Sequence, residues 1–401
     1  MNREGARPRA AAVIIAVLLV VAGEIAAQGS LDYQTSDFFC LYHGARSLVL
    51  GHDPYDSAWW QSVTGGLHPD PWRGQLPSSC AVRYAYPLWT ALAMVPFGAL
   101  PLDIAAPAWM ILSIGATVFG VRALWRSVGG TRENAALFAA LVFTSQPFWL
   151  LLITGQMTGI MLGLSGALAI SLARARETRA GVALALLALK PQLVVLTIPV
   201  ILLRALSDRR RRLVASAVLA AVAMIAVPMV FVPSWLLEWI GQEGPSRLRV
   251  AGLLPTAWGF SADVLGDPLW GAVLAVALLA ACLAIARRGL DALALLALSI
   301  PLSLVVTPHA WSYDFLLLAG PWAYVLARAR RPRAAGTSAL FAASVFVAST
   351  LPWLLYALAF TRGGETLSVV VPAATALLVA AAARIQPRLP RSQAARSRAR
   401  V

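Results

Sequence analysis

The 401-residue sequence predicts an all-α fold, that of a polytopic helical membrane protein. Hydrophobic residues make up 59% of the chain and charged residues 13%, and the mean hydropathy is +0.72, a profile foreign to soluble domains. Apolar runs of the length that a bilayer helix needs recur from Ala10 to Arg384, enough for about ten crossings or more. Runs such as AAVIIAVLLVV lack the alternation of β-barrel strands. The predicted spans are therefore helices, which satisfy their own backbone hydrogen bonds in lipid.

The net charge of +15 does not indicate a nucleic-acid partner. The arginines gather in short loops between apolar runs and in the segment after Arg384, where the positive-inside rule places them. We therefore expect the lipid bilayer as a partner and no nucleic acid. The N-terminal MNREGARPRA leads into an apolar run without a small-residue cleavage site, which predicts an uncleaved first helix.

The arginines also predict the topology of a multi-pass cell-membrane protein. Arg3, Arg7 and Arg9 place the N-terminus in the cytoplasm, so a helix near residues 10–28 runs outward and residues 29–84 form a long first outer loop. Residues 1–385 are expected to form one membrane domain, with a second outer loop at 233–267. Residues 386–401 then form a basic cytoplasmic tail, expected to be disordered. Further spans are expected near residues 103–124, 213–232, 268–286, 289–306, 311–328, 337–359 and 368–385.

Two segments depart from simple alternation across the membrane. Residues 180–206 are basic at both ends, carry Lys190-Pro191 at their centre, and are too short for two spans. They predict two half-helices that meet at Lys190, a break tolerated where it lines a protein-buried or watery cavity. Residues 85–101 have prolines near both ends, and the sequence leaves open whether they cross the membrane or re-enter it.

The first outer loop contains a predicted helix that begins at Asp37, with Ser36 as its N-cap. Its apolar residues recur at helical spacing, at Phe38, Leu41, Ala45, Leu48 and Val49. The pattern predicts an amphipathic helix along the membrane surface. An aspartate in a first turn can also serve only to complement the helix dipole, and this alternative stays open for Asp37.

Three polar residues elsewhere are expected to converge on the same outer face: Gln156 at a turn, Lys190 at the broken helix, and His309 at another turn. A lysine in hydrocarbon costs roughly 3 kcal/mol or more, so Lys190 is predicted to be functional or paired within a cavity. The structural alternatives are a snorkelling lysine, a helix–helix hydrogen bond for Gln156, and a turn histidine without a role.

The positions of the cysteines and the absence of common catalytic motifs limit the kinds of chemistry that the sequence indicates. Cys40 and Cys80 both fall in the outer loop and are disulfide candidates, whereas Cys282 is expected to be a buried thiol within a span. No zinc-site spacing, phosphate loop or GxSxG elbow occurs in the sequence. We expect no cofactor, and no metal because the outer loop lacks a tight carboxylate pair, although Asp53 and Asp56 are close in sequence.

Several short segments follow one another in a recognisable order. They are Asp37-Phe38-Phe39-Cys40-Leu41-Tyr42 with Gly51-His52-Asp53-Pro54-Tyr55; Tyr84-Ala85-Tyr86-Pro87-Leu88 with Pro96 and Pro101; Gly155-Gln156; Ala180-Gly181 with Lys190-Pro191; and Thr307-Pro308-His309-Ala310-Trp311. Over residues 10–330 the chain resembles the polyprenol-phosphate-mannose-dependent mannosyltransferases of glycosyltransferase family 87, a bacterial, largely actinobacterial family with the GT-C fold. It departs from the family in having one proline at Tyr86-Pro87-Leu88 and a histidine in the SPxSW-type turn.

The resemblance implies transfer of a hexose, mannose, from a polyprenyl-phosphate-linked donor to an acceptor hydroxyl on the extracytoplasmic face. The reaction inverts the anomeric centre and belongs to the synthesis of a cell-envelope glycolipid or polysaccharide. Asp37 matches the family's aspartate and is implied as the general base, with Asp32 in reserve. Donor-phosphate and substrate-binding candidates are Lys190, His309, Arg83, Gln156, Tyr86, Asp53 and Tyr55.

Two other classes of function stay open at this point. Broken helices and a buried lysine also mark the pathways of secondary transporters or flippases, and large outer loops can serve a non-catalytic scaffold. The sequence shows no internal repeat, and its polar residues concentrate on one predicted face, which favours the transferase. The acceptor and the donor sugar, mannose or an arabinofuranosyl or other group, are not determined by the sequence.

Overall fold

The computed structural model describes residues 37–64, 84–241, 251–286, 290–329 and 337–384. Within these ranges every regular element is a helix and there is no β-strand. The all-α prediction is confirmed for this part of the chain. The predicted first helix near 10–28 and the predicted tail at 386–401 lie outside the described residues.

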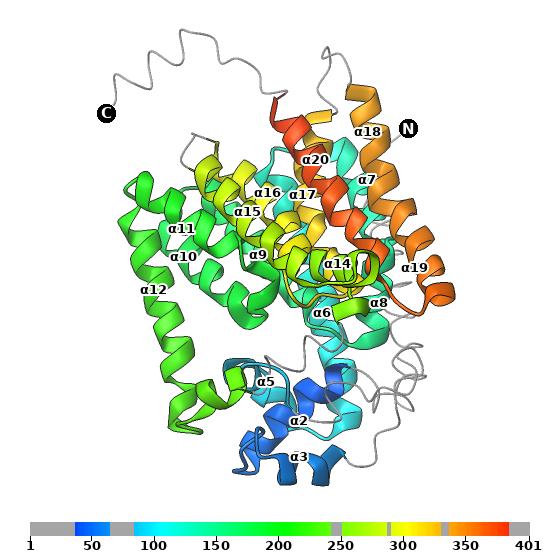
Figure 1. Ribbon diagram of the computed structural model, residues 1–401. Helices are drawn as coiled ribbons and strands as arrows, with labels where there is room; N and C mark the ends of the chain where they lie inside the picture. Colours follow the sequence, from blue (N-terminus) through cyan, green and yellow to red (C-terminus); the bar gives the residue numbers. More distant parts are fainter. Residues whose placement is uncertain (1–36, 65–83, 242–250, 287–289, 330–336, 385–401) are drawn as a thin grey trace, which may run out of the picture.

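The helices form a small layer at one end of the molecule and a larger bundle above it (Figure 1). The small layer consists of α2 (Asp37–Val49), α3 (Ser57–Thr64) and α5 (Leu88–Gly98). The bundle consists of α6 (Leu102–Ser127), α7 (Arg132–Phe143), α8 (Gln146–Thr154), α9 (Thr158–Ala173), α10 (Glu177–Leu186), α11 (Thr197–Ser207), α12 (Arg211–Ala226), α14 (Ala257–Leu265), α15 (Leu269–Ala286), α16 (Ala292–Val306), α17 (Ala319–Ala329), α18 (Thr337–Val345), α19 (Leu351–Arg362) and α20 (Val370–Arg384).

Four helices in the described ranges are long and apolar enough to cross a membrane: Leu102–Ser127, Arg211–Val230, Thr337–Arg362 and Thr366–Arg384. The pair α7 and α8, bent by 52°, forms a fifth candidate. The chain is therefore a multi-pass membrane protein. The described part has fewer full spans than the ten or more predicted, because other apolar stretches form helices of only 10–17 residues.

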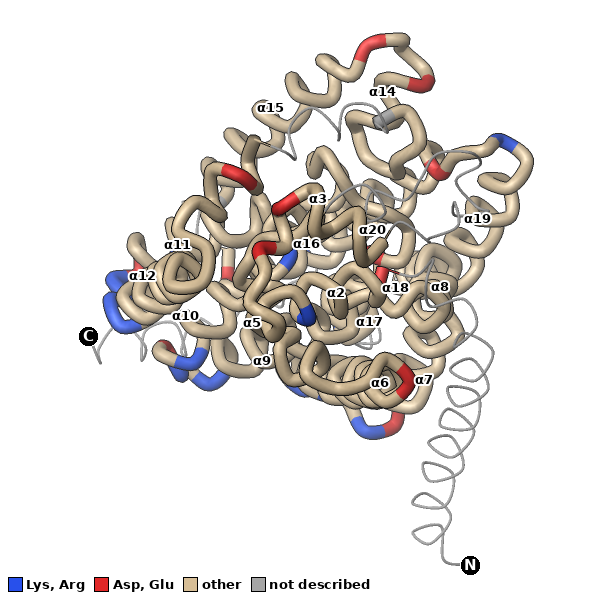
Figure 2. Tube along the Cα trace, turned by 90° about the horizontal axis from the view of Figure 1, so that it is seen from below, with Lys and Arg blue, Asp and Glu red and all other residues tan. Residues whose placement is uncertain are grey.

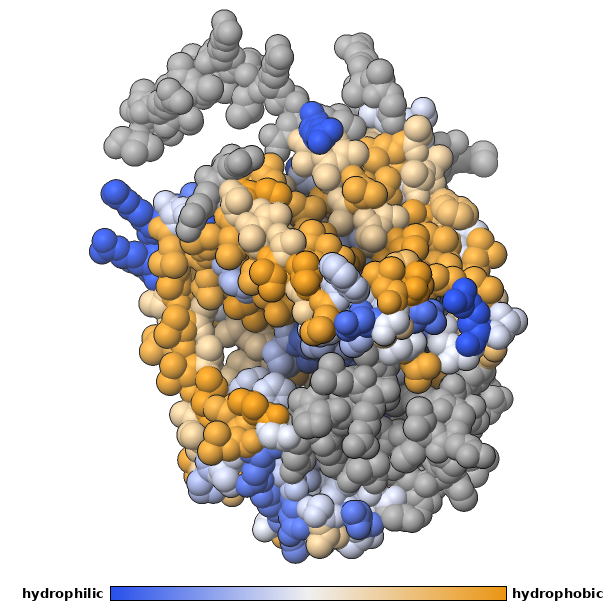
Figure 3. Space-filling model, in the orientation of Figure 1, coloured by the Kyte–Doolittle hydropathy of each residue, from blue (hydrophilic) through white to orange (hydrophobic). Residues whose placement is uncertain are grey.

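Apolar side chains cover much of the outside of the bundle (Figure 3). Leu219 on α12 is 69% exposed and Leu377 on α20 is 73% exposed. Contiguous apolar surface of this extent is unfavourable in water and suits a lipid environment. This surface agrees with the helix lengths in placing the bundle in a bilayer.

The predicted break within residues 180–206 is confirmed. The helix α10 continues as a 3₁₀ turn, η3 (Leu187–Leu189), and a second 3₁₀ turn, η4 (Pro191–Val194), leads to α11. Between them Lys190 leaves the helical conformation, with φ −130° and ψ 77°. Proline at position 191 disfavours the helical conformation for the residue before it, which explains why the chain breaks here.

Neighbouring helices satisfy the backbone groups that the break sets free. Trp89 Nε1 of α5 donates to Ala188 O at 3.0 Å, and Thr90 Oγ1 donates to Leu189 O at 2.8 Å. On the other side, Ser303 Oγ of α16 accepts the N–H groups of Leu196 and Thr197 at 3.1 and 3.2 Å. The break is thus built into the protein interior, as non-helical backbone at membrane depth requires.

The helix predicted in the first outer loop is confirmed as α2, and it is more deeply buried than its amphipathic pattern indicates. Eight of its 13 residues are buried. A Cβ added to Gly44 would lie 2.2 Å from the Tyr84 ring, and one added to Gly98 of α5 would lie 2.7 Å from Arg46 N. Tyr84 and α5 therefore pack closely against α2. Its place at a membrane surface stays a prediction.

The structure bears on the alternative left open for residues 85–101. The helix in this segment, α5, has 11 residues. At 1.5 Å per residue it is about 16 Å long, roughly half of the hydrocarbon core. This length favours re-entry over a full crossing. Trp239, within the predicted second outer loop, donates from Nε1 to Ala85 O at 3.3 Å, so this loop touches the start of the segment.

Candidate active site

The turn at Gly155 and Gln156 separates α8 from α9. Gly155 has φ +63°, the left-handed region that favours glycine, and ends α8. A Cβ on Gly155 would lie 2.6 Å from the Cβ of Phe38, so the turn and α2 approach too closely for a larger residue. Trp109 Nε1 of α6 donates to Gly155 O at 2.8 Å. The turn is thereby fixed against the start of α2, with Gln156 beside Asp37.

Asp37 is contacted by two side chains from distant parts of the chain. Gln156 Nε2 donates a hydrogen bond to Asp37 Oδ2. The hydroxyl of Tyr313 donates to the same oxygen at 3.2 Å. Both partners are donors, which suits a carboxylate as acceptor. Asp37 is therefore oriented by contacts with the bundle, beyond any effect of its place in the first turn of α2.

Lys190 lies on the other side of Gln156. Its Nζ donates to Gln156 Oε1 at 3.3 Å and forms an ion pair with Asp314 Oδ1 at 2.7 Å. Because an ammonium group only donates hydrogen bonds, the oxygen of the Gln156 amide faces Lys190 and its nitrogen faces Asp37. The structure thus brings three of the predicted site residues, Asp37, Gln156 and Lys190, into one hydrogen-bonded chain.

Asp314 completes this chain at its buried end. It lies in a 3₁₀ turn, η7 (Ser312–Leu318), and is fully buried. Besides Lys190, it accepts hydrogen bonds from Thr158 Oγ1 at 2.9 Å and from Trp311 N at 3.1 Å. Both oxygens of Asp314 are therefore occupied. Its carboxylate holds the Lys190 ammonium in place and compensates its charge.

The two carboxylates differ in their access to a substrate. The side chains of Lys190 and Asp314 are 3% and 0% exposed, whereas Asp37 is only half-buried. With all three groups ionised the site carries a net charge of −1, and the uncompensated charge belongs to Asp37. Of the two carboxylates, that of Asp37 is the partly exposed one.

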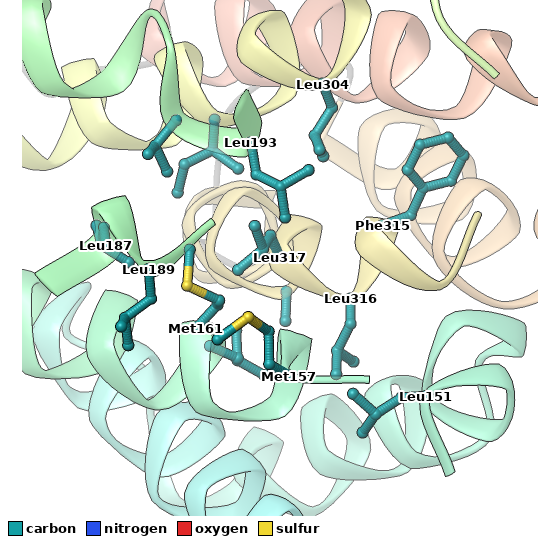
Figure 4. Close-up of a cluster of buried hydrophobic side chains, with 14 of the residues drawn as sticks. Leu151, Met157, Met161, Leu187, Leu189, Leu193, Leu304, Phe315, Leu316 and Leu317 are labelled. Carbon is teal, nitrogen blue, oxygen red and sulfur yellow. The ribbon is translucent and has the colours of Figure 1, made fainter. Parts of the chain in front are cut away.

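An apolar cluster packs around the elements that carry these polar groups (Figure 4). Met157 and Met161 lie between Leu189, next to Lys190, and Leu316, close to Asp314. Water is excluded from this side of the site, which lowers the local dielectric constant and strengthens the ion pair. The cluster thereby fixes the Lys190 ammonium at the chain break.

Tyr86 and Tyr55 lie next to this group in different ways. The buried Tyr86 phenol interacts with Gln156 and lies near the charges of Asp37 and Asp314. Tyr55 is 4% exposed and donates its hydroxyl proton to Tyr86 O at 2.7 Å. Tyr86 therefore borders the site directly, whereas Tyr55 supports the backbone of Tyr86.

Asp53 lies away from the hydrogen-bonded chain. Its Oδ1 accepts the N–H of Tyr55 at 2.8 Å, which shapes the turn between α2 and α3. Burial raises the pKa of Asp53 to about 6; the Tyr55 N–H opposes this shift, and the neighbouring Glu238 carboxyl adds to it. The structure brings Asp53 to Glu238, in the predicted second outer loop, and gives no contact between Asp53 and Asp37.

His309 occupies the turn before η7. Its N–H donates to Thr307 Oγ1 at 3.3 Å, and its ring meets Trp311 edge to face with centroids 6.4 Å apart. Trp311 in turn supplies the N–H that binds Asp314. His309 is thus half-buried and close in sequence to the site, and its role in binding phosphate stays a prediction.

Three predicted residues, Asp32, Arg83 and Cys80, lie outside the described residues. Cys40 takes part in a disulfide, and Cys282 is a free, buried thiol, as predicted for a cysteine within an apolar span. In the part of the chain that the structure describes, no group of three or more His, Cys, Asp or Glu side chains could hold a metal ion. Independence of metal stays a prediction.

Asp314 was not predicted as a site residue, and Tyr313 was not predicted as a partner of Asp37. The sequence contains a signal for Asp314, since an aspartate within the apolar stretch SYDFLLLAG should be functional by default. Its partner was not predictable, because Lys190 is 124 positions away along the chain.

The fold and the site define a multi-pass helical membrane protein with a buried ion pair linked to an accessible carboxylate. A family model for glycosyltransferase family 87 matches residues 84–308, more than half of the chain. The protein belongs to this family, and the family implies a membrane glycosyltransferase of GT-C type. The matched range contains Gln156 and Lys190, while Asp37 and Asp314 flank it. Neither the curated proteins nor the solved structures contain a match to the chain.

Proposed function

We propose that the protein transfers a hexose, mannose, from a polyprenyl-phosphate-linked donor to an acceptor hydroxyl on the outer face of the membrane. The product would serve the synthesis of a cell-envelope glycolipid or polysaccharide. One observation supports the proposal above all others. The accessible carboxylate of Asp37 is joined through a single amide, Gln156, to the buried ammonium of Lys190.

In the proposed reaction the acceptor oxygen attacks the anomeric carbon from the face opposite the phosphate. The bond between that carbon and the phosphate oxygen breaks, the phosphate keeps the electron pair, and the acceptor proton passes to Asp37. One displacement inverts the anomeric centre. The donors from Gln156 and Tyr313 would orient the carboxylate oxygen that receives the proton.

The leaving phosphate needs a cation or hydrogen-bond donors as its charge develops. The Lys190 ammonium has three N–H groups, and two of them are directed at Asp314 and Gln156. The Tyr313 ring lies over Nζ, 5.0 Å away at its centroid, so the donor phosphate would have to displace this ring to reach the third N–H group. We assign that group to the donor phosphate, with His309 and Arg83 as further phosphate ligands. Tyr86 borders Gln156 and would contact the sugar or the acceptor.

Transfer from a radiolabelled donor tests the proposal. Purified protein is incubated with polyprenyl-phosphate-mannose and a membrane glycolipid extract, and labelled product is counted. We expect Asp37→Asn to abolish transfer. Asp291→Asn is the matched control, because Asp291 caps α16 by accepting the N–H of Ala294 at 2.8 Å, a bond that asparagine also makes. Equal transfer by wild type and Asp37→Asn would refute the role of Asp37.

The broken helix at Lys190 also fits a transporter or flippase. The same preparation separates the two functions once it is reconstituted in vesicles. Movement of a lipid-linked sugar across the bilayer without any labelled product would favour the transporter. Product formation in detergent, where there are no compartments, would favour the transferase.

A further inference from the structure

A second charged site lies where α11 turns into α12. Residues 204–212 contain five arginines and one aspartate, Asp208. In the tube view the Lys and Arg positions gather at this edge of α12 and at the neighbouring end of α10 (Figure 2). Arg209 takes a left-handed conformation, with φ +57°, to make the turn. This concentration of charge has no part in the proposed transfer reaction.

Asp208 holds two of these arginines in place. Its Oδ2 pairs with Arg204 Nε at 3.0 Å and lies 3.8 Å from Arg210 Nε. Both guanidinium groups therefore have their Nε atom nearest to the Asp208 carboxylate. Their Nη groups make no hydrogen bond to any other described side chain or backbone group. A guanidinium presents these groups as a fork that fits two oxygens of a phosphate.

The paired arginines line a shallow hollow of about 10 Å³, room for about one water molecule. Its walls are apolar and come from four helices of the bundle. They are Leu172 of α9, Ile201 and Ala205 of α11, Leu213 of α12 and Ala292 of α16. The guanidinium groups of Arg204 and Arg210 therefore lie directly beside apolar side chains.

The local charge around the hollow is far from balanced. The first turn of α12 has no acidic residue, and its N-cap, Arg210, provides no side-chain cap. Helix N-termini carry a partial positive charge, so the arginines add to the field instead of neutralising it. Among the described residues, Arg209, Arg211 and Arg212 have no carboxylate partner. With five arginines and one aspartate, residues 204–212 carry more positive charge than their own carboxylate can balance.

Directly beyond the arginines, α12 presents a long apolar face. Only 22% of its most apolar window is buried within the protein. Leu219, Val222 and Val230 are 69%, 55% and 81% exposed. In the space-filling view this face forms an apolar column below the basic side chains at the left edge of the molecule (Figure 3). Charge and hydrocarbon are thus arranged as they are in a phospholipid.

We propose that this site binds the headgroup of an anionic diacyl phospholipid. Its phosphate sits between Arg204 and Arg210, and its acyl chains run along the exposed face of α12. A general preference for basic loops at one membrane surface explains the number of arginines. It does not explain why one carboxylate, Asp208, holds two guanidinium groups side by side next to apolar side chains. The inference is independent of the proposed transferase function.

Native mass spectrometry of the full chain in detergent tests the proposal, with dioleoylphosphatidylglycerol as the probe and dioleoylphosphatidylcholine as the neutral lipid. Each basic residue near an anionic headgroup strengthens binding by a factor of about five, so Arg204→Gln/Arg210→Gln should weaken binding of the anionic lipid on the order of tenfold or more. Arg174→Gln/Arg176→Gln removes the same charge from the exposed neighbouring turn and should leave binding unchanged.

Asp208→Asn provides a variant that keeps both arginines if the double variant does not fold. It removes the competing carboxylate and should bind the anionic lipid as tightly as wild type or more tightly. The proposal is overturned if the neutral lipid binds equally well, or if both double variants lose binding to the same extent. It is also overturned if inorganic phosphate alone, at equal concentration, displaces the lipid.

Discussion

The ion pair between Lys190 and Asp314 predicts that Asp314→Asn lowers the stability of the protein. Asparagine has nearly the same shape as aspartate but only one acceptor oxygen, so it can keep the hydrogen bond from Thr158 Oγ1 at the Oδ1 position or the one from Trp311 N at the Oδ2 position, and not both. The substitution removes the negative charge that faces the Lys190 ammonium at 2.7 Å, together with one acceptor oxygen. The resulting loss of stability is therefore dominated by the cost of leaving a buried cation without its counter-charge, with a smaller part from the lost hydrogen bond.

The size of the expected loss of stability follows from the burial of Lys190. Lys190 is 3% exposed at its side chain, and its remaining polar partner would be Gln156 Oε1 at 3.3 Å. Removing one member of a buried pair costs about 3–5 kcal/mol. Removing both charges is far less costly, so Lys190→Met/Asp314→Asn should recover about 2 kcal/mol or more of that loss. Transfer should stay absent from the double variant, because no ammonium remains for the donor phosphate.

Thermal unfolding can be followed through Cys282, a free thiol that is 3% exposed in the folded protein. A thiol-reactive dye reports its exposure while product formation is counted in parallel. The expected order of stability is wild type, then the double variant, then Asp314→Asn. If Asp314→Asn is as stable as wild type, or if the double variant is the least stable of the three, the ion pair does not anchor Lys190.

Two further predictions concern single contacts. Gln156→Leu removes an N–H donor from Asp37, which should lower kcat about tenfold to a hundredfold; a kcat equal to that of wild type would argue against the contact. Asp53→Asn should be more stable than wild type at pH 8 and equally stable at pH 4. The folded protein holds the Asp53 proton up to a pKa of about 6, so the wild type loses stability as the pH rises through that value; melting curves at the two pH values check this.

The sequence was most informative where a single residue type fixed the local backbone. Lys190-Pro191 in an apolar segment with basic ends predicted the chain break, because proline disfavours a helical residue before it. The apolar spacing after Asp37 predicted the helix α2. The positions of Gln156 and Lys190 at breaks in apolar segments were sufficient to place them in one candidate site.

The failures share a physical cause, since each depended on contacts between distant segments. The pattern in α2 shows which side is apolar and cannot show that Tyr84 and α5 pack closely against this helix. Hydropathy counts apolar stretches and does not separate a full span from a short helix such as α5. Asp314 was visible as a polar residue in an apolar stretch, but only the fold shows that its partner is Lys190.

Gln156 explains why the two charged groups act together. An amide has a donor end and an acceptor end, and Lys190 can engage only the acceptor. Once Asp314 fixes Lys190, the orientation of the amide is set, and its N–H group is directed at Asp37. A glutamate here would place a third carboxylate beside Asp37, and a leucine would break the connection. Among residues of this length, glutamine alone joins an ammonium to a carboxylate without adding charge. The buried ion pair of Lys190 and Asp314 therefore determines how the accessible carboxylate of Asp37 is held.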